Sequence, residues 1–253
     1  MSAPDLERTR SLLSDMGFEF APALLAELAE RAVKEKLAQL GFLELVLSAE
    51  RERREERRVR TALRLSGLPS TTTLEGFDFL FQPSVDRSRI ELLQTCEYLR
   101  RRENVLLLGP PGVGKTHLAV GLGIKAVSSG FSVSFLSADQ LIEQLGRDDE
   151  AGRPITRRKA LSSALLVIDE LGFQSLDRRQ AHLLFRVIAH RYERASTIIT
   201  SNKSVRDWPE MLAGDEVLAT ALLDRLLHHC HVVSIDGRSF RLRQQQVTKK
   251  PPP

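Results

Sequence analysis

The sequence contains only two cysteines, Cys96 and Cys230, in a chain of 253 residues. Two cysteines so far apart form neither a disulfide framework nor a zinc knuckle, which excludes a small disulfide-stapled scaffold and fits a reducing compartment. The chain also lacks any apolar run near the ~18 residues that would cross a membrane, and its first residues have no signal-peptide core. We therefore expect a cytoplasmic protein with no membrane partner.

A strong net charge is also missing. Lys and Arg number 37 against 33 Asp and Glu, which leaves a net charge of +4. Hydrophobic residues at 42% and charged residues at 28% are typical of a folded soluble protein and argue against wholesale disorder. Local clusters of charge therefore carry more information than the total does.

Residues 1–69 predict a small all-helical domain. Apolar side chains recur every three or four residues over 22–40, which indicates an amphipathic helix, and Gly41 is expected to end it. A second helical pattern begins at Phe42 and runs into an arginine-rich segment, residues 50–64. The polar stretch that follows marks a domain boundary, and we assign residues 70–85 to a linker.

Residues 86–245 predict an α/β domain. A helical pattern covers 86–102, and short apolar runs then alternate with amphipathic segments, which is typical of a parallel sheet covered by helices. The expected strands are 105–108, 132–136, 165–168, 197–200 and 231–235. Residues 246–253 are expected to form a disordered tail.

A complete phosphate-loop pattern lies between an expected strand and an expected helix. The pattern consists of Gly109, Pro110, Pro111, Gly112, Val113, Gly114, Lys115 and Thr116. A chance match in a chain this long has a probability on the order of 1%. Backbone N–H groups of such a loop surround phosphate oxygens, the lysine reaches the β- and γ-phosphates, and the threonine hydroxyl binds Mg²⁺. We expect a nucleoside triphosphate site.

Two carboxylates, Asp169 and Glu170, end the apolar run of residues 164–168. Asp169 is suited to the Mg²⁺ shell, directly or through water. Glu170 is suited to polarising an attacking water, which favours a hydrolase over a small-molecule kinase. The competing interpretation is a solvated acidic turn.

Three further polar residues are candidates on weaker evidence. Asn202 follows an expected strand and could hold the lytic water, although asparagine in that place is often a turn residue. Arg225 lies on an expected helix over 217–229 and could be an ordinary surface arginine. His117 adjoins the phosphate loop and joins the nucleotide-binding residues, as a helix surface residue rather than a catalytic base. The run of residues 228–231, His-His-Cys-His, does not predict a metal site because neighbouring side chains point in different directions.

Three basic clusters are candidates for nucleic acid. Residues 50–64 hold seven arginines and four glutamates. Pairs such as Glu50 with Arg54 and Glu56 with Arg60 would simply stabilise an exposed helix. Four arginines lie beyond the last glutamate and could contact phosphates: Arg57, Arg58, Arg60 and Arg64. The second cluster is Arg157, Arg158 and Lys159. The third lies near the C-terminus and consists of Arg238, Arg241, Arg243, Lys249 and Lys250. For both, a solvated face is an equal alternative.

Several features occur together: the phosphate loop, the pair Asp169 and Glu170, residues 200–202, residues 221–229, and the preceding Leu-Glu-Gly-Phe-Asp-Phe of residues 74–79. This combination resembles the IstB-like family. These are AAA+ ATPases encoded beside the transposase of certain bacterial insertion sequences. The resemblance covers roughly residues 20–245. It implies an AAA+ P-loop core with a parallel sheet and a helical N-terminal domain. The chain departs from the wider AAA+ pattern in one respect, because the residues after the expected strand 231–235 are too few for a full C-terminal helical lid.

The resemblance also implies roles. Arg225 would be an arginine finger acting in a neighbouring subunit, Asn202 would sense the γ-phosphate, and Phe77 and Phe79 would lie near the adenine. The implied function is an ATP- and Mg²⁺-dependent helper that binds duplex DNA, oligomerises on it, remodels it, and recruits or stimulates the transposase. A replicative helicase loader and a DNA-bridging module with a vestigial ATPase site remain alternatives.

Overall fold

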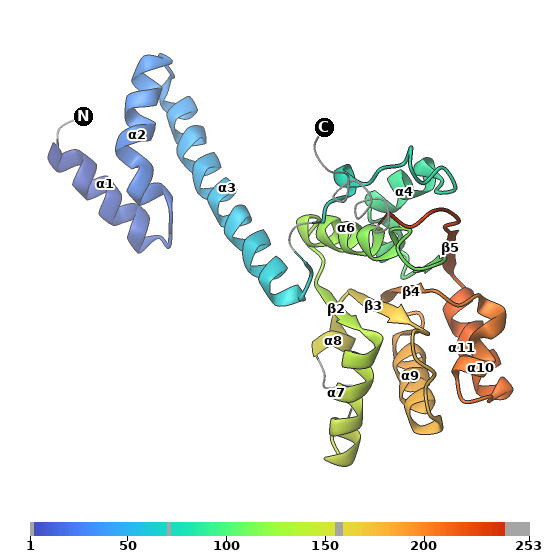
Figure 1. Ribbon diagram of the computed structural model, residues 1–253. Coiled ribbons are helices and arrows are strands. Elements are labelled where there is room, and N and C mark those ends of the chain that lie inside the picture. Colours follow the sequence, from blue (N-terminus) through green and yellow to red (C-terminus); the bar gives the residue numbers. More distant parts are fainter. Residues whose placement is uncertain (1–2, 70–71, 155–158, 241–253) are drawn as a thin grey trace, which may run out of the picture. The chain divides into compact units, whose positions relative to one another are not determined.

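A computed structural model of the chain describes residues 3–69, 72–154 and 159–240 (Figure 1). The chain divides into two compact units, residues 1–61 and 62–253. The division lies inside a continuous helix and earlier than the boundary we expected after residue 69. Residues 62–69 belong with the second unit because Leu68 is buried against Gly123 of that unit.

The first unit consists of three helices, α1 (Ala3–Asp15), α2 (Ala21–Lys34) and most of α3 (Gln39–Ser66). Its small core is made of leucine, alanine, valine and phenylalanine side chains, among them Leu25, Leu28 and Val46. The expectation that Gly41 ends a helix over 22–40 was wrong. Helix α2 ends six residues earlier, where Lys36 adopts a left-handed φ of 54°, and Gly41 lies inside α3.

A buried carboxylate joins α3 to the start of α2. Glu50 is 5% exposed and accepts hydrogen bonds from the backbone N–H groups of Glu19, Phe20 and Ala21 at 2.7–2.8 Å. Burial of Glu50 raises its pKa, but these three hydrogen bonds and Arg54 outweigh burial and lower the pKa to about 2. Glu50 therefore caps the N-terminus of α2 from another helix.

The second unit contains a five-stranded sheet in which all described pairings are parallel. Its strands are β1 (Asn104–Leu108), β2 (Val133–Ser137), β3 (Leu165–Leu171), β4 (Ser196–Ser201) and β5 (Cys230–Ser234). Their spatial order is β2-β3-β4-β1-β5. The predicted parallel sheet is confirmed, and each strand lies within a few residues of its expected range. The carboxyl ends of β1, β3 and β4 consequently meet at one edge, where ligands bind in such sheets.

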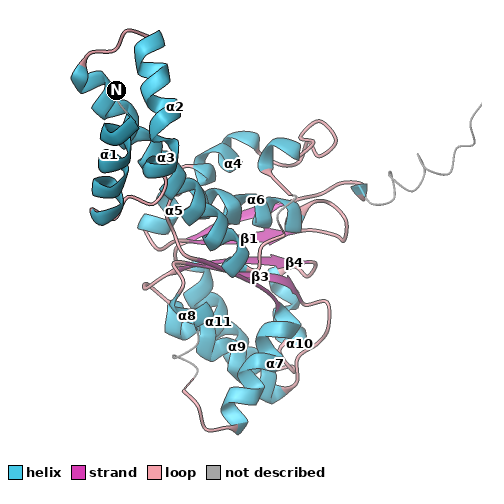
Figure 2. Ribbon diagram, turned by 90° about the vertical axis from the view of Figure 1, so that its left-hand side faces the viewer, coloured by secondary structure: helices cyan, strands magenta, loops and turns pink. Residues whose placement is uncertain are grey.

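Helices cover both faces of the sheet (Figure 2). One face carries α4 (Arg87–Gln94), α5 (Glu97–Arg100) and α6 (Lys115–Ser128). The opposite face carries α7 (Ala138–Glu150), α8 (Lys159–Ser162), α9 (Arg178–Arg191), α10 (Trp208–Met211) and α11 (Glu216–Leu227). Among the described residues, two short 3₁₀ turns, η1 (Leu74–Gly76) and η3 (Val205–Asp207), lie in the connections.

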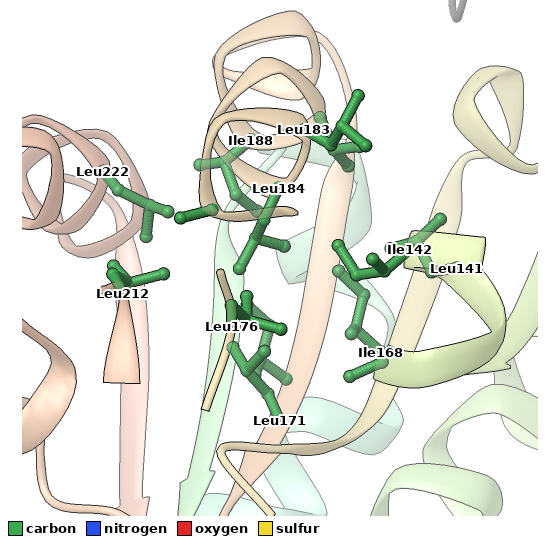
Figure 3. Packing of buried hydrophobic residues seen from close by; sticks show 14 of the residues in the cluster. Leu141, Ile142, Ile168, Leu171, Leu176, Leu183, Leu184, Ile188, Leu212 and Leu222 are labelled. Carbon is green, nitrogen blue, oxygen red and sulfur yellow. The ribbon is translucent and has the colours of Figure 1, made fainter. Parts of the chain in front are cut away.

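The main core lies between the sheet and the second helical layer (Figure 3). Ile168 and Leu171 of β3 pack towards Leu141 and Ile142 of α7 and towards Leu184 of α9. Burial of such side chains is worth roughly 1.5–3 kcal/mol each before entropy is counted. This core holds the strand that ends in the two carboxylates.

The expected helix over 86–102 is divided in two. Asp86 caps α4 by accepting a hydrogen bond from the Arg89 backbone N–H, and the helix then breaks at Cys96, whose φ is 60°. The apolar positions that suggested one helix, Ile90, Leu93, Cys96 and Leu99, are all buried. The left-handed residue changes the direction of the chain and still keeps both short helices on the core.

The segment after β5 returns to the phosphate loop. Ile235 donates a backbone hydrogen bond to the Leu108 carbonyl, and Phe240 donates one to the Gly112 carbonyl at 2.9 Å. The expected disordered tail, residues 246–253, lies outside the described residues. Of the helices that the structure does describe, none is both long enough and apolar enough to cross a membrane.

Candidate nucleotide-binding site

The phosphate loop, residues 109–116, connects β1 to the N-terminus of α6. Gly109 and Gly114 have φ angles of 149° and 102°. A Cβ atom at Gly114 would lie 2.6 Å from the Phe77 ring, and one at Gly109 would overlap the Ile235 carbonyl. Glycine is therefore required at both positions by conformation and by space. The loop presents backbone N–H groups at a helix N-terminus, which is the arrangement that binds phosphate.

Lys115 and Thr116 are the first two residues of α6. The Lys115 ammonium donates to the carbonyls of Gly109 and Pro110 at 2.7 and 2.8 Å, which holds it over the loop. The Thr116 hydroxyl donates to both Asp169 carboxylate oxygens at 3.0 and 3.1 Å. The two residues that we expected to hold Mg²⁺ thus lie together, although they are 53 positions apart in the chain.

A bulge in β3 separates the two carboxylates. The register with β4 shifts between Ile168 and Leu171, and Glu170 in that interval has a φ of 61°. Asp169 is 6% exposed, whereas the Glu170 side chain is exposed and lines the pocket. The bulge therefore directs one carboxylate into the interior and leaves the other accessible to a ligand.

Thr200 of β4 connects these groups. Its hydroxyl donates to Asp169 Oδ1 at 2.6 Å and accepts from the Glu170 backbone N–H at 2.8 Å. The sequence placed Thr200 in the motif of residues 200–202 but predicted no role for it. Its role follows from the pairing of β3 with β4, which local sequence does not specify. Asn202, just beyond the end of β4, is exposed and lines the same pocket.

Part of the pocket wall is aromatic. It is lined by Phe77, Phe81, Gln82 and Phe240, with His117 beside Phe77. The Phe81 and Phe240 rings meet edge to face, with centroids 5.5 Å apart. Of the two phenylalanines that we expected near the base, Phe77 lines the pocket. Phe79 packs against Phe77 and is not among the lining residues.

His117 has a structural contact in this region. Its Nε2 lies 2.6 Å from the Thr73 carbonyl, and its ring meets the Phe77 ring edge to face. The histidine thus joins the segment before α4 to the helix of the phosphate loop. Phe81, Gln82 and Phe240 were missed by sequence reasoning. The alternate aromatic residues of 77–81, in a chain with few aromatics, were the available signal for Phe81.

Arg225 lies outside the pocket of its own chain. It is in the last turn of α11, where its guanidinium donates to the Ala221 carbonyl at 2.7 Å and lies 5.2 Å from the centroid of the Phe185 ring. It is absent from the residues that line the nucleotide pocket. Within one chain, therefore, the structure brings together Lys115, Thr116, Asp169, Glu170 and Asn202 but not Arg225.

The predicted DNA-contacting arginines differ in their surroundings. Arg57 forms an ion pair with Glu19, and Arg58 Nε donates to Glu55 at 2.7 Å. Arg60 and Arg64 are exposed, and no ion pair joins either to a carboxylate of the described residues. Of the two ion pairs that we expected, Glu50 with Arg54 is present. Glu56 pairs with Arg53 instead of Arg60.

The second basic cluster falls mostly outside the described part of the chain. Arg157 and Arg158 are not among the described residues, and Lys159 is the first residue of α8. In the run of residues 228–231, His231 Nε2 lies 2.7 Å from a Glu103 oxygen, apart from the others. The ring centroids of His228 and His229, just past the last residue of α11, are 4.1 Å apart, closer than we expected for neighbours. These exposed rings have no part in the nucleotide pocket.

Together, the sheet order, the phosphate loop and the paired carboxylates define a P-loop ATPase of the AAA+ type. The chain belongs to the IstB-like ATP binding protein family, which matches residues 13–248. It is 44% identical over 224 residues to the ATP-binding protein of insertion sequence IS5376 from Geobacillus stearothermophilus, covering 88% of this chain and 89% of that protein. It is also 44% identical over 236 residues to the ATP-binding protein of IS21 from Pseudomonas aeruginosa, covering 93% and 89%.

Solved structures of replication proteins have a similar fold. The DnaC helicase loader is 28% identical, with a TM-score of 0.50 over 58% of this chain and 86% of that chain. The replication initiator DnaA, bound to AMPPCP and single-stranded DNA, is 23% identical, with a TM-score of 0.54 over 72% and 56%. The likeness to DnaA concerns the fold alone. The family and its insertion-sequence relatives identify the chain as an ATP-binding AAA+ protein and support a role as an ATPase helper of transposition.

Proposed function

We propose that this protein is an ATP-dependent regulator of transposition that oligomerises on duplex target DNA, remodels it, and recruits or stimulates the transposase. ATP hydrolysis acts as the switch between states. The observation that carries the enzymatic part is the cluster of Thr116, Asp169 and Thr200 beside an accessible Glu170. The insertion-sequence context of the relatives supports the transposase as the partner.

The polar residues that line the pocket have different proposed chemical roles. Lys115 lies over the phosphate loop and would neutralise phosphate charge. Glu170 would orient the attacking water and take its proton. Asn202, on the adjacent strand end, would hold that water or detect the terminal phosphate. Each of these side chains reaches the cavity from a different element, so the site forms only when the sheet is assembled.

The donor set fits Mg²⁺. A hydroxyl and a carboxylate, both oxygen ligands, lie within 3.1 Å of each other at the phosphate loop. Thr116 and Asp169 would hold the ion, which when bound offsets the charge of the phosphates. Thr200 keeps the Asp169 carboxylate in one orientation, as residues behind metal ligands commonly do.

Arg225 would act in trans. A guanidinium at a subunit boundary can stabilise charge that develops on a neighbour's γ-phosphate. Its place on α11, away from the pocket of its own chain, supports this arrangement. The proposed assembly is a homo-oligomer in which each active site receives its arginine from an adjacent subunit.

Helix α3 would supply a sequence-independent contact with DNA. Its arginine-rich part carries seven arginines and four glutamates, and several glutamates are already paired within the unit. Among the four arginines predicted to contact DNA, Arg60 and Arg64 are exposed and form no ion pair with a carboxylate of the described residues, so they remain available for phosphates. Contacts of this kind give affinity that falls with salt and depends little on sequence.

The test is phosphate release from ATP by the full-length protein, with and without duplex DNA, together with sizing of the complexes. We expect ATP-dependent oligomers on duplex DNA and a hydrolysis rate that changes when DNA is added. A hydrolysis rate that does not change with DNA, together with no DNA-bound assembly in the presence of ATP, would contradict the proposed regulatory function and support only an ATPase activity.

A replicative helicase loader is the second candidate, favoured by the 28% identity to the DnaC helicase loader. A loader would use the same ATP site but would bind a helicase ring instead of duplex DNA. The two functions are separated by adding either duplex DNA or a hexameric helicase to the ATPase assay. Stimulation by the helicase alone would favour the loader.

A further inference from the structure

Two turns of the ATPase unit bring three metal-binding side chains together. One carboxylate oxygen of Glu193 and one ring nitrogen each of His228 and His229 all lie within 4.8 Å of one another. All three side chains are exposed, so an ion in solution can reach them. The sequence predicted no metal site in the run of residues 228–231, because neighbouring side chains diverge on a helix or strand. His228 and His229 lie between the last residue of α11 and the first residue of β5, outside both elements.

The backbone of both turns is attached to the start of the first strand. The His229 carbonyl accepts a hydrogen bond from the backbone N–H of Asn104, the first residue of β1, at 2.7 Å. Glu193 has a left-handed φ of 56°, and its carbonyl accepts from the Arg102 guanidinium at 2.9 Å. These contacts limit the movement of one turn relative to the other. Ligands on a fixed backbone lose less conformational freedom when an ion binds.

Tyr192 provides a partner for one of the histidines. Its hydroxyl lies 2.9 Å from Nδ1 of His228, and the centroids of the two rings are 5.9 Å apart. A hydrogen bond at one nitrogen of an imidazole fixes the tautomer and the orientation of the ring. Histidines that bind metal ions commonly have such a partner.

We propose that Glu193, His228 and His229 bind a divalent transition-metal ion of the Zn²⁺ type. Imidazole nitrogens combined with a carboxylate oxygen suit zinc and its neighbours, whereas Mg²⁺ prefers oxygen ligands alone. The exposed side chains rotate to place their donor atoms about 2.0–2.2 Å from the ion. Three protein ligands leave the fourth tetrahedral position for water or for a ligand from another molecule.

This site is separate from the nucleotide pocket. Glu193 precedes β4 and His229 precedes β5, so the ligands lie at the amino ends of these parallel strands. The phosphate loop follows the carboxyl end of β1, at the opposite edge of the sheet. None of the three ligands lines the nucleotide pocket.

The experiment titrates the untagged full-length protein with Co²⁺, whose visible absorption reports the number and type of ligands, and then displaces Co²⁺ with Zn²⁺. Excess Mg²⁺ is present and nucleotide is absent, so that the oxygen ligands of the nucleotide site are offered the ion they prefer. We expect the wild-type protein to bind Co²⁺ with the absorption of a tetrahedral nitrogen and oxygen site, and Zn²⁺ to abolish that absorption.

Substitution of each ligand should weaken the binding of Co²⁺. Glu193→Gln, His228→Gln and His229→Gln should each raise the dissociation constant by about a hundredfold, the upper end of the loss seen for partners behind metal ligands. His182→Gln changes an exposed histidine of α9 outside the cluster and should leave the constant unchanged. All four variants should bind ATP as the wild-type protein does, which shows that they fold.

Two results would overturn the site. The first is a wild-type protein that binds no Co²⁺ in excess Mg²⁺, or binds it equally well when His228 and His229 are both replaced by glutamine. The second is a charge-transfer absorption from a thiolate, which would assign the ion to Cys230 and contradict the proposed ligands.

Discussion

The two units of this protein use charged residues in opposite ways. In the ATPase unit, residues 62–253, Arg191 is 2% exposed. Its guanidinium donates to the Thr197 hydroxyl and to the carbonyls of Leu161, Ser163 and Ser196. In the helical unit, residues 1–61, the arginines of α3 are exposed, and three of them, Arg53, Arg54 and Arg58, pair with glutamates one turn away. Buried charge requires specific partners, whereas exposed charge needs only water and a few ion pairs.

Because of this difference, the two units should respond differently to single substitutions. Chemistry in the ATPase unit depends on a few side chains held at defined atoms, so one substitution should remove it. DNA contact by the helical unit would depend on a sum of similar charges, so single substitutions should reduce it gradually. Glu50 is the exception in the helical unit, because it is buried and has several specific partners.

The largest effect is expected for Arg225→Ala. If Arg225 stabilises charge on a neighbour's phosphate, its loss should slow hydrolysis by about a thousandfold and leave ATP binding intact. Steady-state phosphate release and nucleotide titration measure the two effects. Arg186→Ala, an exposed arginine paired with Asp149 on the same helical layer, is the matched control.

Mixed oligomers test the action in trans. A Lys115→Ala subunit has an impaired site but keeps its arginine, so mixing it with Arg225→Ala subunits should restore activity. Mixtures that assemble and stay inactive would argue that Arg225 acts elsewhere.

The next largest effect is expected for Glu170→Gln. The amide keeps the shape but cannot take a proton, so turnover should fall about a hundredfold or more while ATP still binds. Because hydrolysis would release the assembly, the variant should also form long-lived complexes with duplex DNA. Phosphate release and dissociation of labelled DNA measure both effects. Glu91→Gln, in an exposed ion pair with Arg87, is the control, and normal turnover in Glu170→Gln would remove Glu170 from the mechanism.

Glu50→Gln should weaken the helical unit specifically. The neutral amide replaces charge-assisted hydrogen bonds, which are worth roughly 1.5–3 kcal/mol each. Amide exchange of Phe20 and Ala21 in the full-length protein should accelerate about tenfold or more. Exchange in the β-sheet of the ATPase unit should not change. Glu35→Gln, an exposed partner of Arg31, serves as the control. Equal acceleration in both units would contradict a local cap.

The contribution of Glu50 to the stability of the helical unit should also depend on pH. The pKa of Glu50 is about 2 in the folded protein, below its ordinary value. Its stabilisation is therefore complete above the ordinary value of about 4.3 and is lost as the pH falls towards 2. Protection of the Phe20 amide should decline over that interval in the wild-type protein and less steeply in Glu50→Gln.

The smallest effects are expected for the arginines of α3. Arg60→Ala and Arg64→Ala should each weaken duplex binding several-fold, uniformly across sequences, and lower the salt slope by about one. Arg57→Ala and Arg58→Ala should do less, since both guanidiniums already meet carboxylates. Fluorescence anisotropy at several salt concentrations measures this, with Arg31→Ala of α2 as control. Unchanged slopes would make this segment a solvated surface.

The parts of the fold that could be predicted depend on local patterns. The strands are short apolar runs, and the phosphate loop is a contiguous motif whose glycines meet a conformational requirement. The breaks at Lys36 and Cys96 were not predictable, because both are left-handed conformations of residues with side chains. They occur where packing on a core outweighs the local preference for a continuous helix.

By itself, the sequence determined that this chain has a phosphate loop, two carboxylates after an apolar strand, and an arginine-rich helix. Only the tertiary structure decided that Thr200 holds Asp169, that Glu50 caps α2, and that Gln82 meets the Arg238 carbonyl across 156 positions. The physical reason is that a motif specifies neighbours along the chain. The partners of a buried polar group are chosen by sheet order and helix packing, which bring together residues that no local pattern connects.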